Sequence, residues 1–107
     1  MKIAYALPDK LLTNQDLVKL YPEWTDDKIY SKTGIRSRHV VEFGQGALEL
    51  AENACRKLFQ AEDVDPEVVD FVLLCTQSPK YRLPSSACIL QHRLGVPTTA
   101  GALDYDL

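Results

Sequence analysis

The stretch DFVLLC at residues 70–75 is almost continuously apolar. Runs of this kind are typical of a strand in a parallel sheet that is covered on both faces. The residues that follow, PSSACILQHRLGVP at 84–97, predict a helix that opens after a proline and ends at Gly95. Residues 99–107 then predict a second strand, because apolar and acidic side chains alternate from Leu103 to Leu107. This order predicts helices packed on a parallel sheet.

The segments upstream of this unit continue the alternation. Residues 3–7 are a short apolar run that predicts a strand, and residues 35–41 predict a strand or an extended arm. Between them, TNQD at 13–16 and TDD at 25–27 are helix start signals, each with acidic residues where the helix dipole favours them. The whole pattern predicts an α/β fold with a mixed, mostly parallel sheet and packed helices.

The strongest helical pattern covers about residues 47–60. Its small and apolar residues fall on one stripe at helical spacing, which predicts a face packed closely on the sheet. The stripe consists of Ala47, Leu50, Ala51, Ala54 and Leu58.

Length and composition limit the classes of protein that this sequence can represent. The 107 residues suffice for one small domain, and 46% hydrophobic with 25% charged residues is ordinary for a globular protein. The formal net charge is -3 and the basic residues are scattered, so we expect no nucleic-acid surface. No stretch has the length of a membrane span, so we expect a cytoplasmic protein that binds no membrane.

The cysteines indicate a reducing compartment. There are three of them, with wide spacing and no C-x-x-C pair, so we expect neither a disulfide framework nor a metal site. Cys55 and Cys75 lie in apolar patterns and are expected in the core.

The sequence ends within the second predicted strand, with no cap, turn or polar tail after Leu107. In open α/β sheets the functional site lies beyond the carboxyl ends of the strands. We therefore expect residues 1–107 to be a single incomplete domain, truncated after a core strand.

Three stretches, in order along the chain, resemble the β-ketoacyl-acyl carrier protein synthase III family of condensing enzymes. They are LP at 7–8 followed by LTNQDL at 12–17, then TGIRSRH at 33–39, then TQSP at 76–79 followed by LPSSAC at 83–88. The resemblance covers essentially the whole chain and implies the N-terminal part of a thiolase-like fold.

The resemblance also implies an activity. Members of the family are acyltransferases of fatty acid biosynthesis, which condense an acyl thioester primer with malonyl-acyl carrier protein by decarboxylative Claisen chemistry through a cysteine acyl-enzyme. The family's nucleophilic cysteine would follow just after Leu107, and its catalytic histidine and asparagine would lie further downstream. The catalytic residues are thus outside the chain, and we expect residues 1–107 alone to be inactive.

Some of the family's substrate-binding positions fall within the chain, at the segment that contacts the nucleotide end of coenzyme A. There the family's tryptophan is replaced by Lys28 and its arginine by Lys32. Trp24, four residues before Lys28, has two interpretations. It could cover the adenine from the neighbouring turn, or it could be a packing residue, which general grounds favour. Thr33 and Arg36 complete the residues expected to bind coenzyme A or the phosphopantetheine of a carrier protein.

The resemblance further implies an assembly. Leu83 matches a family position, often phenylalanine, that lines the partner subunit's acyl pocket, and the last strand matches one that pairs across the dimer. The expected partners are therefore acyl carrier protein, acyl-CoA and a second copy of the chain, with no bound prosthetic group.

Two groups of residues have both a functional and a purely structural interpretation. Lys32, Arg36 and Arg38 are either a phosphate-binding cluster or a solvated face. Cys88 and His92, four residues apart on a predicted helix, are either a nucleophilic pair or a core cysteine beside a surface histidine. We favour the second interpretation of that pair, because no third orienting group accompanies it.

Two further points concern function. Asp104 and Asp106 share a face of the last strand, but without another ligand nearby we do not expect a metal or acid–base pair.

Two alternatives to the leading function stay open. One is another thiolase-fold condensing enzyme, of the hydroxymethylglutaryl-CoA synthase or polyketide type, and the other is a non-catalytic module that dimerises through its last strand.

Overall fold

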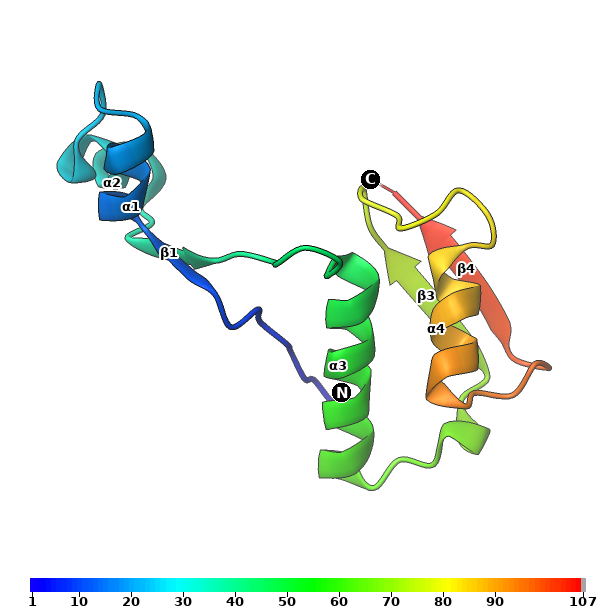
Figure 1. Ribbon diagram of the computed structural model, residues 1–107. Coiled ribbons are helices and arrows are strands. Elements are labelled where there is room, and N and C mark those ends of the chain that lie inside the picture. The colour runs from blue at the N-terminus through cyan, green and yellow to red at the C-terminus, as the bar shows by residue number, and fades with distance from the viewer. Residues whose placement is uncertain (107) are drawn as a thin grey trace. The chain divides into compact units, whose positions relative to one another are not determined.

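The computed structural model describes residues 1–106, and Leu107, which the sequence places in the last strand, lies outside them (Figure 1). The chain folds as two units, one of residues 7–43 and one of residues 1–6 with residues 44–106. Each unit contains its own two-stranded sheet. Among the described residues, no helix is both long and apolar enough to cross a membrane.

The larger unit is built on two parallel strands joined by a helix. β3 (Phe71–Cys75) and β4 (Gly101–Tyr105) pair in parallel, with Phe71 opposite Gly101. α4 (Ser86–Leu94) connects the two strands and packs on both of them (Figure 1). The strand–helix–strand order predicted from residues 70–107 is confirmed, as is the helix end at Gly95, which adopts the left-handed conformation with φ 72°.

α3 (Ala47–Glu62) packs on α4, and a short 3-10 turn, η1 (Pro66–Val68), leads into β3. The predicted stripe of α3 is only half-buried, and the centre of its packed face is Leu48, which is 2% exposed. The difference arises because α3 packs on a helix in this unit, whereas the stripe was expected to lie on a sheet. The core cluster contains Leu48, Leu90, Leu94 and Val96, with Ala51, Cys55, Phe59 and Val72 packed against it.

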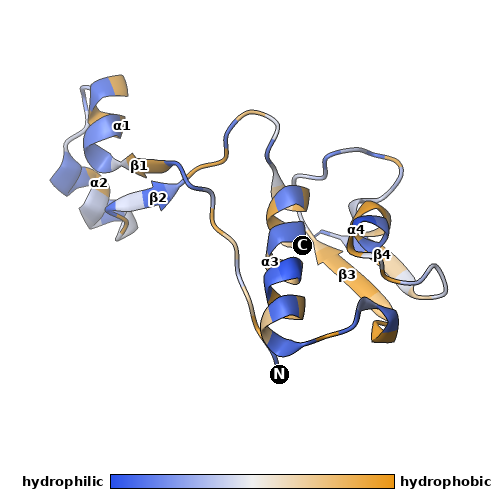
Figure 2. Cartoon of the chain, turned by 60° about the horizontal axis from the view of Figure 1, so that its bottom comes forward, coloured by the Kyte–Doolittle hydropathy of each residue, from blue (hydrophilic) through white to orange (hydrophobic). Residues whose placement is uncertain are grey.

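The sheet of the larger unit is covered on one face only within residues 1–106. Leu74 is buried, whereas Leu73 on the opposite face is 61% exposed and its neighbour Leu103 is 53% exposed. In Figure 2, β3 is hydrophobic along its length, whereas α3 and α4 alternate between hydrophilic and hydrophobic residues. The prediction that residues 70–75 are covered on both faces is therefore wrong for the described chain, because both helices of this unit lie on the Leu74 side of the sheet.

Two of the three cysteines are more exposed than expected. Cys75 belongs to the open face of β3 and is exposed, and Cys88 is exposed on α4, so neither is a core residue of the described chain. Cys55 on α3 is half-buried, as expected, and burial raises the pKa of its thiol.

The smaller unit is an antiparallel strand pair with two short helices. β1 (Leu11–Thr13) pairs with β2 (Ser37–His39), and α1 (Asn14–Leu20) and α2 (Asp26–Thr33) lie between them in sequence. The two predicted helices are confirmed, and both begin at threonine caps.

The first of these caps is a reciprocal capping box. The Thr13 hydroxyl and backbone N–H both donate to the Asp16 carboxylate, at 2.6 and 3.1 Å, while the Asp16 backbone N–H donates to the Thr13 hydroxyl. These hydrogen bonds from Thr13 lower the pKa of Asp16 to about 2. At the other end of this pair of helices, Gly34 ends α2 with φ 69°, a conformation that favours glycine.

Residues 3–7 form no strand, so that prediction is wrong. The segment is extended, but no described strand lies beside it to exchange backbone hydrogen bonds, and Ile3 and Tyr5 are each 74% exposed. The chain pairs instead a few residues later, at β1, where the Val40 N–H also donates to the Lys10 carbonyl at 2.9 Å.

Candidate functional site

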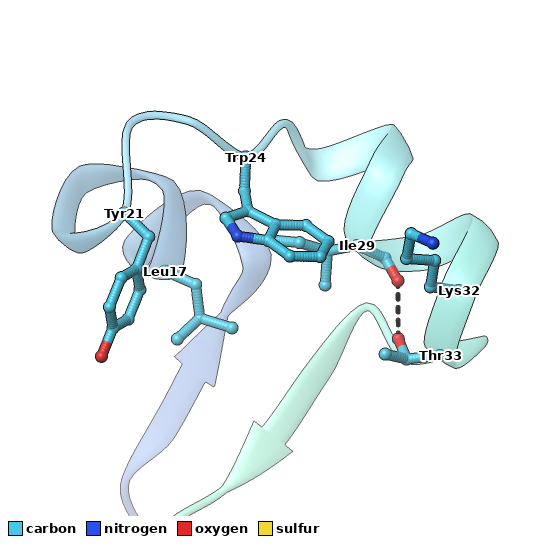
Figure 3. Close-up of a pocket in the computed structure, with 6 residues that line it drawn as sticks. All are labelled: Leu17, Tyr21, Trp24, Ile29, Lys32 and Thr33. Carbon is cyan, nitrogen blue, oxygen red and sulfur yellow. Dashed lines mark hydrogen bonds between the residues drawn. The ribbon is translucent and has the colours of Figure 1, made fainter.

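The smaller unit contains an apolar cavity of about 410 Å³ between its two helices (Figure 3). Its lining residues come from α1, α2 and the turn that joins them. They are Leu17, Tyr21, Trp24, Ile29, Lys32 and Thr33. Apart from the Thr33 hydroxyl and the lysine and tyrosine tips, the lining side chains are apolar, and Trp24 supplies the largest flat surface.

Local sequence signals build this cavity. Pro22 follows the end of α1, and the Trp24 N–H donates to the Tyr21 carbonyl at 3.0 Å, which closes the turn that brings the indole between the helices. Ile29 of α2 is 8% exposed and forms the floor. The Thr33 hydroxyl donates to the Ile29 carbonyl at 2.8 Å, which fixes the last turn of α2 (Figure 3).

The predicted carrier-binding residues divide into two groups. Trp24, Lys32 and Thr33 line the cavity, and Lys28 contacts it indirectly, because its ammonium lies 4.6 Å from the centre of the Trp24 ring. Arg36 does not line the cavity, and its guanidinium stacks 4.0 Å from the Tyr30 ring instead. Both stacked cations form cation–π contacts.

The expected basic cluster is also divided. Arg38 donates to the Asn14 side-chain oxygen at 2.7 Å and to the Leu12 carbonyl at 3.4 Å, so it acts inside the unit. Within residues 1–106, the Lys32 ammonium makes no hydrogen bond or ion pair. Of the three cations expected to form a phosphate-binding cluster, Lys32 is the one that lines the cavity, and its ammonium is free to bind an anionic group of a ligand.

Sequence reasoning missed Leu17, Tyr21 and Ile29 as lining residues. The available signal was the four-residue spacing of Leu17 and Tyr21, which places them on one side of α1 and its end. A flat aromatic surface, an apolar floor and one ammonium at the rim suit a ligand with a planar or apolar part next to an anionic group.

The larger unit has a second hollow, of about 350 Å³, at the carboxyl ends of β3 and β4. This is the edge of a parallel sheet at which α/β proteins usually place their sites. The hollow is more polar than the first. It is lined by Thr76, Gln77, Pro79, Tyr81, Arg82, Ser85, Asp104, Tyr105 and Asp106.

Asp104 has a structural role at this edge. Its carboxylate accepts hydrogen bonds from the Ser86 N–H at 2.6 Å and from the Ala87 N–H, which are the first two amides of α4. A carboxylate at a helix N-terminus is stabilised by those amides and by the helix dipole.

Replacing Asp104 with asparagine is expected to lower the stability of the β4–α4 contact by about 1–2 kcal/mol, because a neutral amide loses the charge-assisted part of two hydrogen bonds. Equilibrium denaturation of the protein measures the change. Asp106→Asn is the matched control, since Asp106 is exposed and makes no hydrogen bond within the described residues. Equal stability of the two variants would contradict the role given to Asp104.

The remaining predicted positions are exposed. Leu83 lies between β3 and α4 and is 86% exposed, so its contact with a partner subunit stays a prediction. Cys88 and His92 are both exposed on α4, with no hydrogen bond between them among residues 1–106. The cysteine expected after Leu107 lies outside the described residues.

The chain is similar along nearly its whole length to several proteins named 3-oxoacyl- or β-ketoacyl-[acyl-carrier-protein] synthase III. A solved 3-oxoacyl-(acyl-carrier-protein) synthase III is 55% identical, with a TM-score of 0.92, over 98% of this chain and 31% of that one. A second solved synthase III, from Thermus thermophilus, is 28% identical with a TM-score of 0.90, over 100% of this chain and 32% of that one. No protein-family model matches the chain.

Curated relatives agree with the solved structures. The β-ketoacyl-[acyl-carrier-protein] synthase III of Methylococcus capsulatus is 42% identical over 94 residues, which are 88% of this chain and 29% of that protein. That of Lactococcus lactis is 35% identical over 104 residues, or 97% of this chain and 30% of that protein. The chain thus spans about 30% of the length of the relatives it matches. The chain is therefore similar to a segment of the β-ketoacyl-[acyl-carrier-protein] synthase III proteins, and it has the fold of the corresponding part of their solved structures.

Proposed function

We propose that this chain is the N-terminal part of a 3-oxoacyl-[acyl-carrier-protein] synthase III-like acyltransferase. The observation that carries the proposal is the 55% identity to a solved synthase III over 98% of the chain, at a TM-score of 0.92. In the proposed reaction a cysteine thiolate attacks the carbonyl of an acyl thioester and releases the carrier thiol. Malonyl-acyl carrier protein then loses carbon dioxide, and the resulting carbanion attacks the acyl-enzyme and expels the cysteine thiolate.

The chain's own contribution is proposed to be substrate binding and a platform for the nucleophile. The Trp24 cavity takes the planar or apolar part of a coenzyme A or phosphopantetheine carrier, and the Lys32 ammonium at its rim meets a phosphate. The hollow at the carboxyl ends of β3 and β4 is where the acyl group and the downstream cysteine meet. The supporting observations are the apolar lining with one available cation, and the position of the second hollow.

The assembly is proposed on the same basis. β4 pairs with β3 on one side only among the described residues, so its other edge has backbone groups available for a strand of a second copy. Leu83, which is exposed, would then reach the partner's acyl pocket. Acyl-CoA and acyl carrier protein are the proposed donor and acceptor partners.

The test is an acylation and condensation assay on the parent protein that carries this chain. We expect acyl-CoA to leave a thioester on a cysteine encoded soon after the Leu107 codon, and malonyl-acyl carrier protein to discharge it as a 3-oxoacyl product. Residues 1–107 alone are expected to stay unmodified. A parent without that cysteine, or a stable thioester on the exposed Cys88, would overturn the proposal and favour a non-catalytic module in the first case.

A further inference from the structure

The segment of residues 76–85, here called the strand-end loop, forms one wall of the hollow at the carboxyl ends of β3 and β4. It is the loop between β3 and α4 in Figure 1. It contains no helix or strand, and its own turn is supported by the Ser78 N–H, which donates to the Thr76 hydroxyl at 3.0 Å. Tyr81 and Arg82 of this loop line the hollow. The shape of that wall therefore depends on what holds the loop in place.

One side chain of the loop reaches away from the hollow to α3. The Lys80 ammonium forms an ion pair with the Glu49 carboxylate and lies 3.5 Å from the Gly44 carbonyl. The two side chains are 33% and 22% exposed, so the pair is partly shielded from water. Screening by solvent is weaker for such a pair than for one on an open surface.

Glu49 is itself held in position by other groups. Its second carboxylate oxygen accepts a hydrogen bond from the N–H of the N-cap residue Gly46 at 2.9 Å, at the start of α3. Arg93 of α4 lies 3.6 Å from Glu49 and bonds Glu52 at 3.0 Å. These contacts already restrict the Glu49 side chain, so pairing with Lys80 costs little further side-chain entropy. A cation that binds this carboxylate is therefore connected to both helices of the unit.

The hydrogen bond from Lys80 is also the main cause that lowers the pKa of Glu49, so the carboxylate stays ionised at neutral pH.

We propose that the Glu49–Lys80 pair is a latch that positions the strand-end loop, and with it the Tyr81 and Arg82 wall of the hollow. Glu49 and Lys80 are positioning residues, since neither lines the hollow. The identity of the acyl thioester that enters the hollow rests on the proposed function, whereas the latch itself does not.

The first experiment measures the loop directly, by trypsin cleavage of the parent protein after Lys80 and Arg82. Glu49→Gln removes the charge but leaves both cleavage sites, and the glutamine amide oxygen can still accept the hydrogen bond from the Gly46 N–H at the start of α3. We expect cleavage in the loop to be about two- to fivefold faster, the factor that a pair of this exposure supplies. Glu67→Gln is the matched control, because Glu67 is exposed and its side chain has no partner among residues 1–106. Equal cleavage of the Glu49→Gln variant and the control overturns the latch.

The second experiment separates positioning from a general loss of stability. In the acylation assay of the parent protein, Lys80→Met, which keeps the aliphatic stem, is expected to raise KM for acyl-CoA about two- to fivefold with kcat unchanged. Lys80→Arg, which keeps the charge, is expected to restore the wild-type KM. A wild-type KM in Lys80→Met, or no rescue by arginine, overturns the proposal. If the wild-type parent is not acylated at all, the proposed function fails, while the cleavage rates still decide whether the latch exists.

Discussion

Replacing Asn14 with alanine is expected to destabilise the smaller unit by about 3 kcal/mol. Asn14 is 1% exposed, and its amide nitrogen donates to the Asp26 carboxylate at 3.0 Å and to the Ile35 carbonyl at 2.9 Å. Its side-chain oxygen accepts the bond from Arg38 at 2.7 Å. One side chain thus joins the start of α1 to α2, to β2 and to the segment between them. Alanine leaves these partners without their hydrogen bonds, and each loss of this kind costs about 1–3 kcal/mol when the group is buried.

Native-state hydrogen exchange measures this effect within the unit. The Val40 N–H, which bonds the Lys10 carbonyl beside β1 and β2, should exchange through an opening whose free energy falls in the variant. Asn53→Ala is the matched control, because Asn53 is exposed on α3 in the other unit. If the two variants protect Val40 equally, Asn14 does not hold the unit together.

Asn14 also shows where sequence reasoning stops. The signals that worked were local: a threonine followed by an acid three residues later at Thr13, and Gly95 at the end of α4. Asn14 was identified only as part of a helix start, because its partners are 12, 21 and 24 residues away in sequence. No local pattern distinguishes a buried asparagine that joins three segments from an exposed capping residue.

Packing was predicted less well than secondary structure for the same reason. The run at residues 70–75 is apolar on both faces, but the described helices cover only the face of Leu74. Residues 3–7 have a strand-like pattern, yet a strand forms only when another strand lies beside it. Asp104 was considered only together with Asp106, on the same face of the last strand, whereas its hydrogen-bond partners are backbone amides 17 and 18 residues before it.

The candidate site was predicted in part, through resemblance more than through spacing. Trp24, Lys32 and Thr33 do line one cavity, but the apolar residues that give the cavity its floor and far wall were not identified. Arg36 was placed in the set as a member of the basic cluster with Lys32 and Arg38. Its contact with the Tyr30 ring depends on how the chain turns after Gly34.

Replacing Trp24 with alanine in the parent protein is expected to weaken coenzyme A binding about 10- to 100-fold. The indole is the largest flat surface of the cavity, and stacking of a base on an aromatic side chain contributes about 1–3 kcal/mol when measured by alanine substitution. Lys28 already lies 4.6 Å from one side of this ring, so the ring is held in place before a ligand arrives. Calorimetric titration with coenzyme A measures the dissociation constant.

The packing role that Trp24 could have instead makes a different prediction, so the same variants distinguish the two. Trp24→Phe keeps a smaller ring in the cavity and is expected to lose only a few-fold in affinity, because most of the flat surface remains. Lys28→Met removes the cation above the ring but leaves the cavity lining intact, and its effect should also be small. If Trp24→Ala lowers the unfolding temperature but leaves the dissociation constant unchanged, the indole serves packing alone. If Trp24→Ala instead raises the dissociation constant for coenzyme A with little change in the unfolding temperature, the cavity binds the coenzyme A carrier. A residue that only packs would affect ligand binding no more than it affects folding.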